Sequence, residues 1–453
     1  MAKPWSEVDL IREAFHYQTR FDGSTMVFKV DFPVAEGPLF PSLAKDLALL
    51  SRSGFHVVIV PGAKERIDAV LSEYRIVSSY TNVKVPYDDR ALTLSTPIRI
   101  TTNAAMPFVE MAAFDVATRF MTGLAGSRVD AIIGNFVRGR GLGVLNGAPM
   151  ERTGTVDKFY TESLNRVLNL GMVPILPCIG WSPSGKPYNV PSDEIALQAA
   201  LNLKAIKLFI VTLSGGLTNK SCALPEGIAA DSEGRPPRLS PQEAAKILRL
   251  NAPAFPSKPL SELSLAYQAL EGGVERVHIV DGGEEGAVLR EIFSNTGSGT
   301  MLNADEYESI RPIRSKDVPD LLRLMEPLMR EGVLLRRTAE EIQQHKDEFA
   351  VFVIDNRIHA CAALREWGEG QAEIAALATD PAYVDKGLGS ALVRCLTEKA
   401  RKRGLTRVFV LTTRTQDWFE ALGFREAPLS SLPSRKRAAY DSSRNSLIFA
   451  LDL

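Results

Sequence analysis

The chain lacks the features that would carry it into or across a membrane. No run approaches the roughly 20 consecutive apolar residues that span a bilayer. The opening MAKPWSEVDLIREAF places charges where a secretory signal needs an apolar centre. The formal net charge is only −1, so no overall field favours nucleic acid or an anionic membrane. We therefore expect a cytoplasmic protein with neither nucleic acid nor membrane as a partner.

Clustered cysteine and histidine are also missing. The sequence has 4 cysteines and 5 histidines, and no two cysteines form a C-x-x-C pair. Scattered cysteines are typical of reduced, mostly buried residues in a cytoplasmic protein. The histidines show no metal-ligand spacing either, so we predict no metal site.

Short apolar runs alternate with helical patterns from residue 24 to residue 293. Apolar spacing of three and four predicts helices within 38–54 and 193–205, and the polar, Pro- and Gly-rich stretch 225–243 predicts a surface loop. The runs predicted as buried strands are 25–30, 56–61, 130–134, 172–177, 206–212 and 276–280. This alternation predicts an open, mostly parallel sheet with helices on both faces.

The pattern changes after the small and polar residues 294–310. A strand and a helix, a hairpin with Asp355-Asn356 at its turn, a further strand, an amphipathic helix over 388–404 and late strands follow. This order predicts a smaller mixed α/β domain. We predict two domains, residues 1–300 and residues 301–453.

The stretch VDKGLGSALV (384–393) places Gly387 and Gly389 between a predicted strand and a predicted helix. Unpaired N–H groups and the dipole at a helix start favour an anion. Glycines let a pyrophosphate approach the backbone, and Lys386 adds positive charge. The spacing alone fits a simple helix start equally well.

This arrangement resembles the GNAT N-acetyltransferase family, whose acetyl-CoA motif is Q/R-x-x-G-x-G/A. Val384 stands at the first position of the motif, so a side-chain contact to phosphate is missing there, while the backbone cradle remains. The resemblance implies acetyl-CoA as co-substrate, held partly by a strand that splays from its neighbour. The implied cofactor-binding residues are Leu377, Thr379, Lys386, Gly387, Gly389 and Ser390.

Four further stretches resemble the bacterial N-acetylglutamate synthase family, which acetylates glutamate at the start of arginine biosynthesis. They are LLRRT (334–338), AEIAALATDP (372–381), LTTRTQDWFEALGF (411–424) and AYDSSRNSLIFALDL (439–453). The resemblance implies Glu373 as general base, directly or through a water, and Thr412 as an optional proton donor to the leaving thiolate. It also implies Arg336, Arg444 and Ser446 as substrate-binding residues, because guanidinium groups suit carboxylates. On the residues alone, Glu373 is a solvated strand glutamate and either arginine a surface charge.

Most of residues 24–300 resemble the amino-acid kinase fold, which implies a three-layer αβα domain. A working kinase of this type has K-x-G-G after its first strand and a glycine triplet after its second. This chain has Lys29-Val30-Asp31-Phe32 at the first place and only Gly62 at the second. Without the glycines that clamp ATP phosphates we predict no kinase activity. Asn189 and Asp193 match the positions that, in acetylglutamate kinases of this fold, bind acetylglutamate and organise the lysines.

The end of this region, residues 277–302, resembles arginine-sensitive members of the family. The resemblance implies that Glu291 and Gly297 bind L-arginine as an effector and that an N-terminal helix over 9–21 closes the site. It also implies a homo-oligomer, a hexamer in relatives. The alternative is that Glu291 caps or salt-bridges a surface helix.

The patterns together predict acetyl transfer from acetyl-CoA to the α-amine of L-glutamate in a ternary complex, under the control of L-arginine. Three alternatives stay open: a bifunctional synthase and kinase, a non-enzymatic arginine sensor, and an acetyltransferase for another amino acid.

Overall fold

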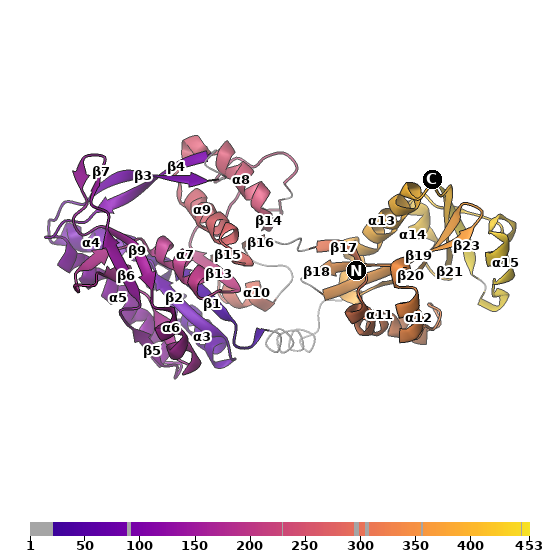
Figure 1. The fold of residues 1–453 in the computed structure, drawn as a ribbon, viewed down its shortest axis with the longest axis horizontal. Coiled ribbons are helices and arrows are strands. Elements are labelled where there is room, and N and C mark those ends of the chain that lie inside the picture. Colours follow the sequence, from indigo (N-terminus) through magenta and orange to yellow (C-terminus); the bar gives the residue numbers. More distant parts are fainter. Residues whose placement is uncertain are drawn as a thin grey trace. The chain divides into compact units, whose positions relative to one another are not determined.

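The computed structural model describes residues 21–87, 92–228, 230–293, 299–303, 308–354, 357–444 and 446–453. The described residues form two compact units, the first from 21 to 303 and the second from 308 to 453 (Figure 1). Each unit has its own sheet and its own apolar cores, so each is described by itself.

The first unit is built on an eight-stranded sheet of order β14-β16-β15-β13-β1-β2-β10-β5. Neighbouring strands pair in parallel except β15 and β16. The strands are β1 (Thr25–Val30), β2 (His56–Pro61), β5 (Ala131–Ile133), β10 (Val173–Ile175), β13 (Lys207–Thr212), β14 (Arg238–Leu239), β15 (Arg276–Asp281) and β16 (Thr300–Asn303). The predicted mostly parallel sheet is confirmed. The predicted division at residue 300 falls at the start of β16, and we propose that the first domain extends through Asn303.

Helices cover both faces of this sheet because alternate residues of each strand point to opposite sides. In β1, Phe28 belongs to one apolar core and Val27 to the other. One face carries α2 (Phe32–Glu36), α3 (Phe40–Arg52), α4 (Lys64–Glu73), α5 (Met106–Ala125) and α10 (Ala287–Phe293). The other carries α6 (Thr161–Asn169), α7 (Ser192–Asn202), α8 (Pro241–Leu250) and α9 (Lys258–Glu271). The predicted αβα layering is confirmed.

Two parts of the first unit differ from the sequence-based prediction. The stretch 225–243 contains β14 and the first turn of α8, where Ser240 and Glu243 form a capping box. A second sheet, β12-β11-β6-β9, and the hairpin of β3 and β4 were not predicted. Their strands are β3 (Ser79–Tyr87), β4 (Leu92–Ile100), β6 (Val137–Gly141), β9 (Gly154–Phe159), β11 (Ile179–Trp181) and β12 (Pro187–Asn189). Between β6 and β9 in the chain, β7 (Val144–Leu145) and β8 (Ala148–Pro149) pair with each other.

The second unit has a seven-stranded sheet of order β17-β18-β19-β20-β21-β23-β22, antiparallel except for β20 and β21. The strands are β17 (Glu308–Pro312), β18 (Phe349–Ile354), β19 (Arg357–Gly368), β20 (Gln371–Thr379), β21 (Arg407–Thr412), β22 (Arg425–Glu426) and β23 (Leu447–Asp452). This confirms the predicted smaller mixed α/β fold. β18 and β19 form the predicted hairpin, and its turn, Asp355-Asn356, lies outside the described residues.

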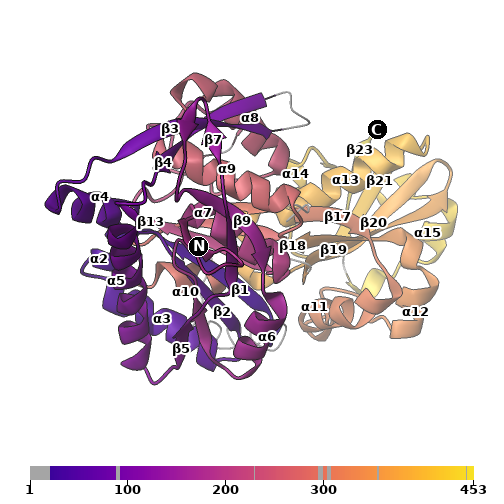
Figure 2. The same cartoon turned by 60° about the vertical axis from the view of Figure 1, so that its left-hand side comes forward.

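Helices cover both faces of this sheet as well (Figure 2). Leu392 and Leu396 of α13 (Leu388–Lys402) pack into one core, while α11 (Val318–Arg330) and α12 (Ala339–Gln344) pack into the other. The 3-10 turn η4 (Pro381–Lys386) precedes α13, and the short helices α14 (Gln416–Ala421) and α15 (Ser434–Ala438) follow it. A helix with the length and apolar character to span a membrane is not found in the part of the chain that the structure describes.

Candidate active site

Two parallel strands of the second unit diverge near the middle of its sheet. β20 and β21 pair over three residues of each strand, ending at Glu373 and Phe409, although β20 continues to Thr379. The described residues make no further pair between these strands. The free edge of β20 therefore presents backbone N–H and C=O groups to the opening. The predicted positions Leu377 and Thr379 lie on this free part of β20.

A bulge interrupts β20 within this free part. The register against β19 shifts there, so Ala376 and Leu377 together oppose Ala362 alone. Ala376 has a φ of +53°, in the left-handed region that alanine rarely adopts. Bulges are common beside active sites because they change which face the following residues present. An alanine gives no turn signal, so the sequence did not reveal this bulge.

The glycine pair lies where η4 turns into α13. Gly387 immediately precedes the helix with a φ of +76°, a conformation that L side chains rarely adopt. A Cβ on Gly389 would lie 3.5 Å from Oγ1 of Thr379. Gly387, Gly389, Ser390 and Thr379 are thus brought together around the unpaired N–H groups of the helix start. The backbone of Lys386 ends η4, and its side chain lies outside the described part.

Glu373 is only 8% exposed, so it is not the solvated glutamate that the residues alone suggested. Its Oε2 accepts hydrogen bonds from Nε1 of Trp367 at 2.9 Å and from Nζ of Lys436 at 2.6 Å. Neither partner was predicted. Lys436 follows Glu373 by 63 residues, so no local pattern in the sequence could link them.

Two arginines complete the charged surroundings of Glu373. Arg365 lies opposite Glu373 in the register of β19, and its Nε donates to Glu348 at 2.9 Å. Arg337 is half-buried, with its guanidinium 5.6 Å from the ring centroid of Phe349. Burial and the charge of Arg365 lower the pKa of Arg337, while the carboxylates of Glu373 and Glu348 oppose this change. Glu373 thus lies among three cationic side chains, those of Lys436, Arg365 and Arg337.

Thr412 lies at the end of β21 and is buried. Its Oγ1 accepts N–H groups from Arg414 at 3.3 Å and from Thr415 at 3.1 Å, and lies 2.8 Å from the Thr415 hydroxyl. The hydroxyl therefore stabilises the turn that leaves β21. Its role as a proton donor to the thiolate stays a prediction.

The predicted substrate arginines lie on segments that contact each other. Nη2 of Arg444 donates to the carbonyls of Gly332 and Val333, both at 2.9 Å, just before Arg336 in the chain. Arg336 is exposed. The carbonyl of Ser446 accepts a hydrogen bond from the Tyr440 hydroxyl at 2.8 Å. Arg444 thus joins the C-terminal segment to the loop that carries Arg336.

The lysine expected at the first kinase loop is held by carboxylates of the chain itself. Nζ of Lys29 lies 2.5 Å from Asp31 and 2.9 Å from Asp193, and the other oxygen of Asp31 lies 2.8 Å from Nζ of Lys258. Burial opposes these charges, yet the two lysines hold the pKa of Asp31 down at about 2. Burial alone would lower the pKa of Lys29, but the carboxylates of Asp193 and Asp31 raise it above its usual value. Asn189, the other matching position, donates to Oγ1 of Thr101 at 2.9 Å.

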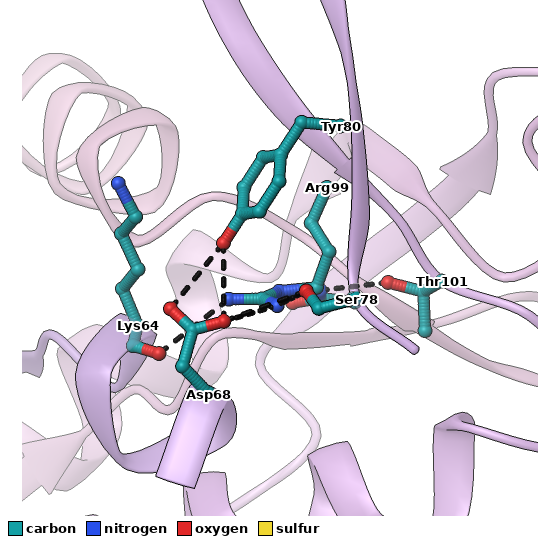
Figure 3. Close-up of polar contacts among 7 residues, drawn as sticks. Lys64, Asp68, Ser78, Tyr80, Arg99 and Thr101 are labelled. Atoms are coloured by element: carbon teal, nitrogen blue, oxygen red, sulfur yellow. Dashed lines mark hydrogen bonds and ion pairs between the residues drawn. The ribbon is translucent and has the colours of Figure 1, made fainter. Parts of the chain in front are cut away.

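Residues of the second kinase loop are bound to the hairpin of β3 and β4 (Figure 3). Asp68 accepts hydrogen bonds from Nη1 of Arg99 at 2.7 Å and from the Tyr80 hydroxyl at 3.3 Å. Arg99 also bonds to Ser78 and to the carbonyl of Lys64, and its guanidinium lies 4.9 Å from the Tyr80 ring centroid. The carboxylate of Asp68 is therefore paired within the chain.

Glu291 lies in α10 and its side chain is buried. Its Oε1 lies 2.8 Å from Nδ1 of His278, and its Oε2 accepts the N–H of Gly299 at 3.3 Å. Burial, together with the charge of Lys207, lowers the pKa of His278 to about 4, so the imidazole is neutral and donates to Glu291. Gly297 lies outside the described residues, and the arginine-binding role of both positions stays a prediction.

Across the described ranges, no group of three or more His, Cys, Asp or Glu side chains is arranged to hold a metal ion. The four cysteines are free thiols.

Two family models match the two units. The amino acid kinase family matches residues 23–223, and the acetyltransferase (GNAT) family matches residues 317–424. The amino-acid acetyltransferase of Neisseria meningitidis serogroup B is 34% identical over 458 aligned residues, which cover 99% of this chain and 98% of that protein.

Solved structures match over the same length. The crystal structure of N-acetylglutamate synthase from Neisseria gonorrhoeae complexed with coenzyme A and L-arginine has a TM-score of 0.82 at 31% identity, covering 99% of this chain and 100% of that one. The structure of that synthase complexed with coenzyme A and N-acetyl-glutamate has a TM-score of 0.59 at 33% identity, with the same coverage.

Proposed function

Because the chain belongs to the family of bacterial amino-acid acetyltransferases, we propose that it transfers the acetyl group of acetyl-CoA to the α-amine of L-glutamate. The observation that carries this proposal is the buried carboxylate of Glu373 at the point where β20 and β21 diverge. A proton acceptor beside a free strand edge is what acetyl transfer to a protonated amine needs.

The free edge of β20 and the start of α13 hold acetyl-CoA. Backbone groups of Leu377 and Thr379 pair with the pantetheine arm, while N–H groups near Gly387, Gly389 and Ser390 bind the pyrophosphate. Lys386 adds a positive charge at the rim. The thioester carbonyl then lies in the opening next to Glu373.

The chemistry is a direct transfer. Glu373 takes a proton from the ammonium group of glutamate, directly or through a water, and the free amine attacks the thioester carbon. The nitrogen of the tetrahedral intermediate still carries an extra proton, which it gives up as the C–S bond breaks. That proton passes to the departing thiolate through the hydroxyl of Thr412 or through a water, so the neutral amide and the CoA thiol remain. Thiolate is a good leaving group, so the donor matters less than the base.

Arg336 and Arg444 bind the two carboxylates of glutamate, and Ser446 adds a hydroxyl. Guanidinium groups suit this task because they offer paired donors in one plane. The bonds from Arg444 to the loop before Arg336 support a shared site.

L-arginine acts as an effector through the first unit, with Glu291 and Gly297 at its site. The carboxylate of Glu291, which already accepts hydrogen bonds from His278 and Gly299, pairs with the guanidinium of the ligand. The protein is a homo-oligomer and works in the cytoplasm, which its free cysteines support. Light scattering on the purified chain gives the oligomeric state.

Thiol release from acetyl-CoA tests the proposal, with L-glutamate as acceptor and with or without L-arginine. We expect glutamate-dependent release that arginine changes. Glu373→Gln should lower kcat by about 10²- to 10⁴-fold, the usual contribution of a general base. Glu366→Gln, which removes a half-exposed carboxylate paired with Arg403, is the matched control. No release with glutamate, or full activity of Glu373→Gln, would refute the assignment.

A further inference from the structure

Lys436 is a buried cation in a helix whose other cations face solvent. In α15 the neighbours Arg435 and Arg437 are exposed, whereas Lys436 is 9% exposed. Lysine is almost never buried unless it is paired, because burying an ammonium group is costly. Its Nζ lies 2.6 Å from Oε2 of Glu373 and 4.7 Å from the ring centroid of Trp367.

Both hydrogen bonds that the described residues make to the Glu373 carboxylate end on one oxygen. The Trp367 indole and the Lys436 ammonium both donate to Oε2. A carboxylate oxygen with two donors is a poor acceptor for a further proton. The other oxygen, Oε1, is therefore left as the acceptor for a substrate proton.

The helix that carries Lys436 is fixed in place. The N–H of Ser434 donates to Oε1 of Glu369 at 3.0 Å, and its hydroxyl donates to the same oxygen at 2.6 Å. Glu369 lies in the turn between β19 and β20, two strands that carry Trp367 and Glu373. The two side chains that bond to Glu373, Trp367 and Lys436, therefore lie where β19, β20 and α15 meet.

We propose that Lys436 is a positioning residue for acetyl transfer, which with Trp367 fixes Oε2 of Glu373 and presents Oε1 to the amine. This inference rests on the proposed role of Glu373 as general base. Lys436 acts through Glu373 and does not contact the reacting atoms.

The pH dependence of the reaction distinguishes this role from a structural one. The charged groups that face Glu373 are Lys436 from α15, Arg365 from β19 and Arg337 from the loop before α12, with Glu348 beside both arginines. Lys436 is the cation in direct contact with the carboxylate. Removing this cation takes away the positive charge that touches Oε2, so the acid limb of the rate profile is the readout of its role.

The experiment measures kcat/KM for glutamate from pH 5.5 to 9.5 in the full-length protein. We expect Lys436→Met to move the acid limb upward by about 1 to 3 pH units relative to the parent protein. Lys436→Arg keeps the charge and should keep the limb. Trp367→Phe removes a donor but no charge, so kcat should fall without a shift of the limb. Arg435→Met, an exposed neighbour, is the control and should match the parent protein.

The outcomes separate the proposal from its premise. Loss of activity in Lys436→Met that is equal at every pH, or a profile that superimposes on that of the parent, would overturn the positioning role. If Lys436→Met does not fold by circular dichroism, Lys436→Arg and Trp367→Phe decide, and a shifted limb in Lys436→Arg or in Trp367→Phe would overturn the proposal. A fully active Glu373→Gln would refute the base assignment itself, whereas an inactive Glu373→Gln with an unshifted Lys436→Met would refute only the role of Lys436.

Discussion

Replacing His278 with asparagine should remove part of the acid sensitivity of the first unit. His278 is 1% exposed and stacks on Phe209 with ring centroids 4.8 Å apart. Burial, and then the charge of Lys207, lower its pKa from 6.5 to about 4. The His278 imidazole therefore binds a proton near pH 6.5 in the unfolded chain, but only near pH 4 in the folded chain. The stability that His278 contributes is complete above pH 6.5 and is lost as the pH falls from there toward 4.

The magnitude follows from the two pKa values. Their difference of about 2.5 units corresponds to roughly 3 kcal/mol in total, of which about 2 kcal/mol is lost between pH 8 and pH 5. Asparagine does not titrate in this range, and its amide can replace the Nδ1 donor to Glu291. The variant should therefore lose about 2 kcal/mol less than the parent over the same pH interval.

Amide hydrogen exchange of β13 and β15 measures the opening free energy of this unit at each pH, after correction for the intrinsic exchange rate. The reasoning would be refuted if the parent and His278→Asn lost the same free energy between pH 8 and pH 5. A parent whose opening free energy rises on acidification would refute it as well, because the sign would be opposite.

Three further predictions concern single positions. Gly387→Ala should raise the KM for acetyl-CoA and cost about 1–2 kcal/mol, because alanine resists a φ of +76°; an unchanged KM in steady-state kinetics would contradict it. Lys29→Met should lower the free energy of unfolding by about 3–5 kcal/mol, because it leaves buried Asp31 without its nearest cation; urea denaturation checks this, and an equally stable variant would count against it. Thr412→Val should destabilise the protein by about 1–3 kcal/mol through two unpaired N–H groups, while Thr412→Ser should not; thermal unfolding compares them.

Much of the fold could be predicted from the sequence because local patterns determine it. The run TMVFKV predicted β1 with its bounds, since a buried parallel strand needs a continuous apolar run. Gly387 and Gly389 were predicted to open a helix, and they do. In each case the signal lies within about ten residues, the range over which periodicity and turn chemistry act.

The rest of the candidate site depends on contacts between distant segments. The pairing of Glu373 with Lys436 joins residues far apart in the chain, and a lysine in the run SRKRA looks like any solvated cation. The position of Arg337 near Glu373 was likewise not predicted, because the sequence does not show which of two adjacent arginines faces the site. The bulge at Ala376 is seen only in the pairing of β19 with β20, and an alanine at this position does not predict it.

The pairing of Asp31 with Lys29 and Lys258 has a thermodynamic consequence. If buried Lys29 and half-exposed Lys258 depended on a diffusible anion, the stability of the first unit would vary with the concentration of that anion, through RT ln(1 + [anion]/Kd). Here the anion is a side chain of the same molecule, held at 2.5 Å and 2.8 Å from the two ammonium groups. The contribution of these two lysines to the folding free energy of this unit is thereby independent of the concentration of phosphate or nucleotide.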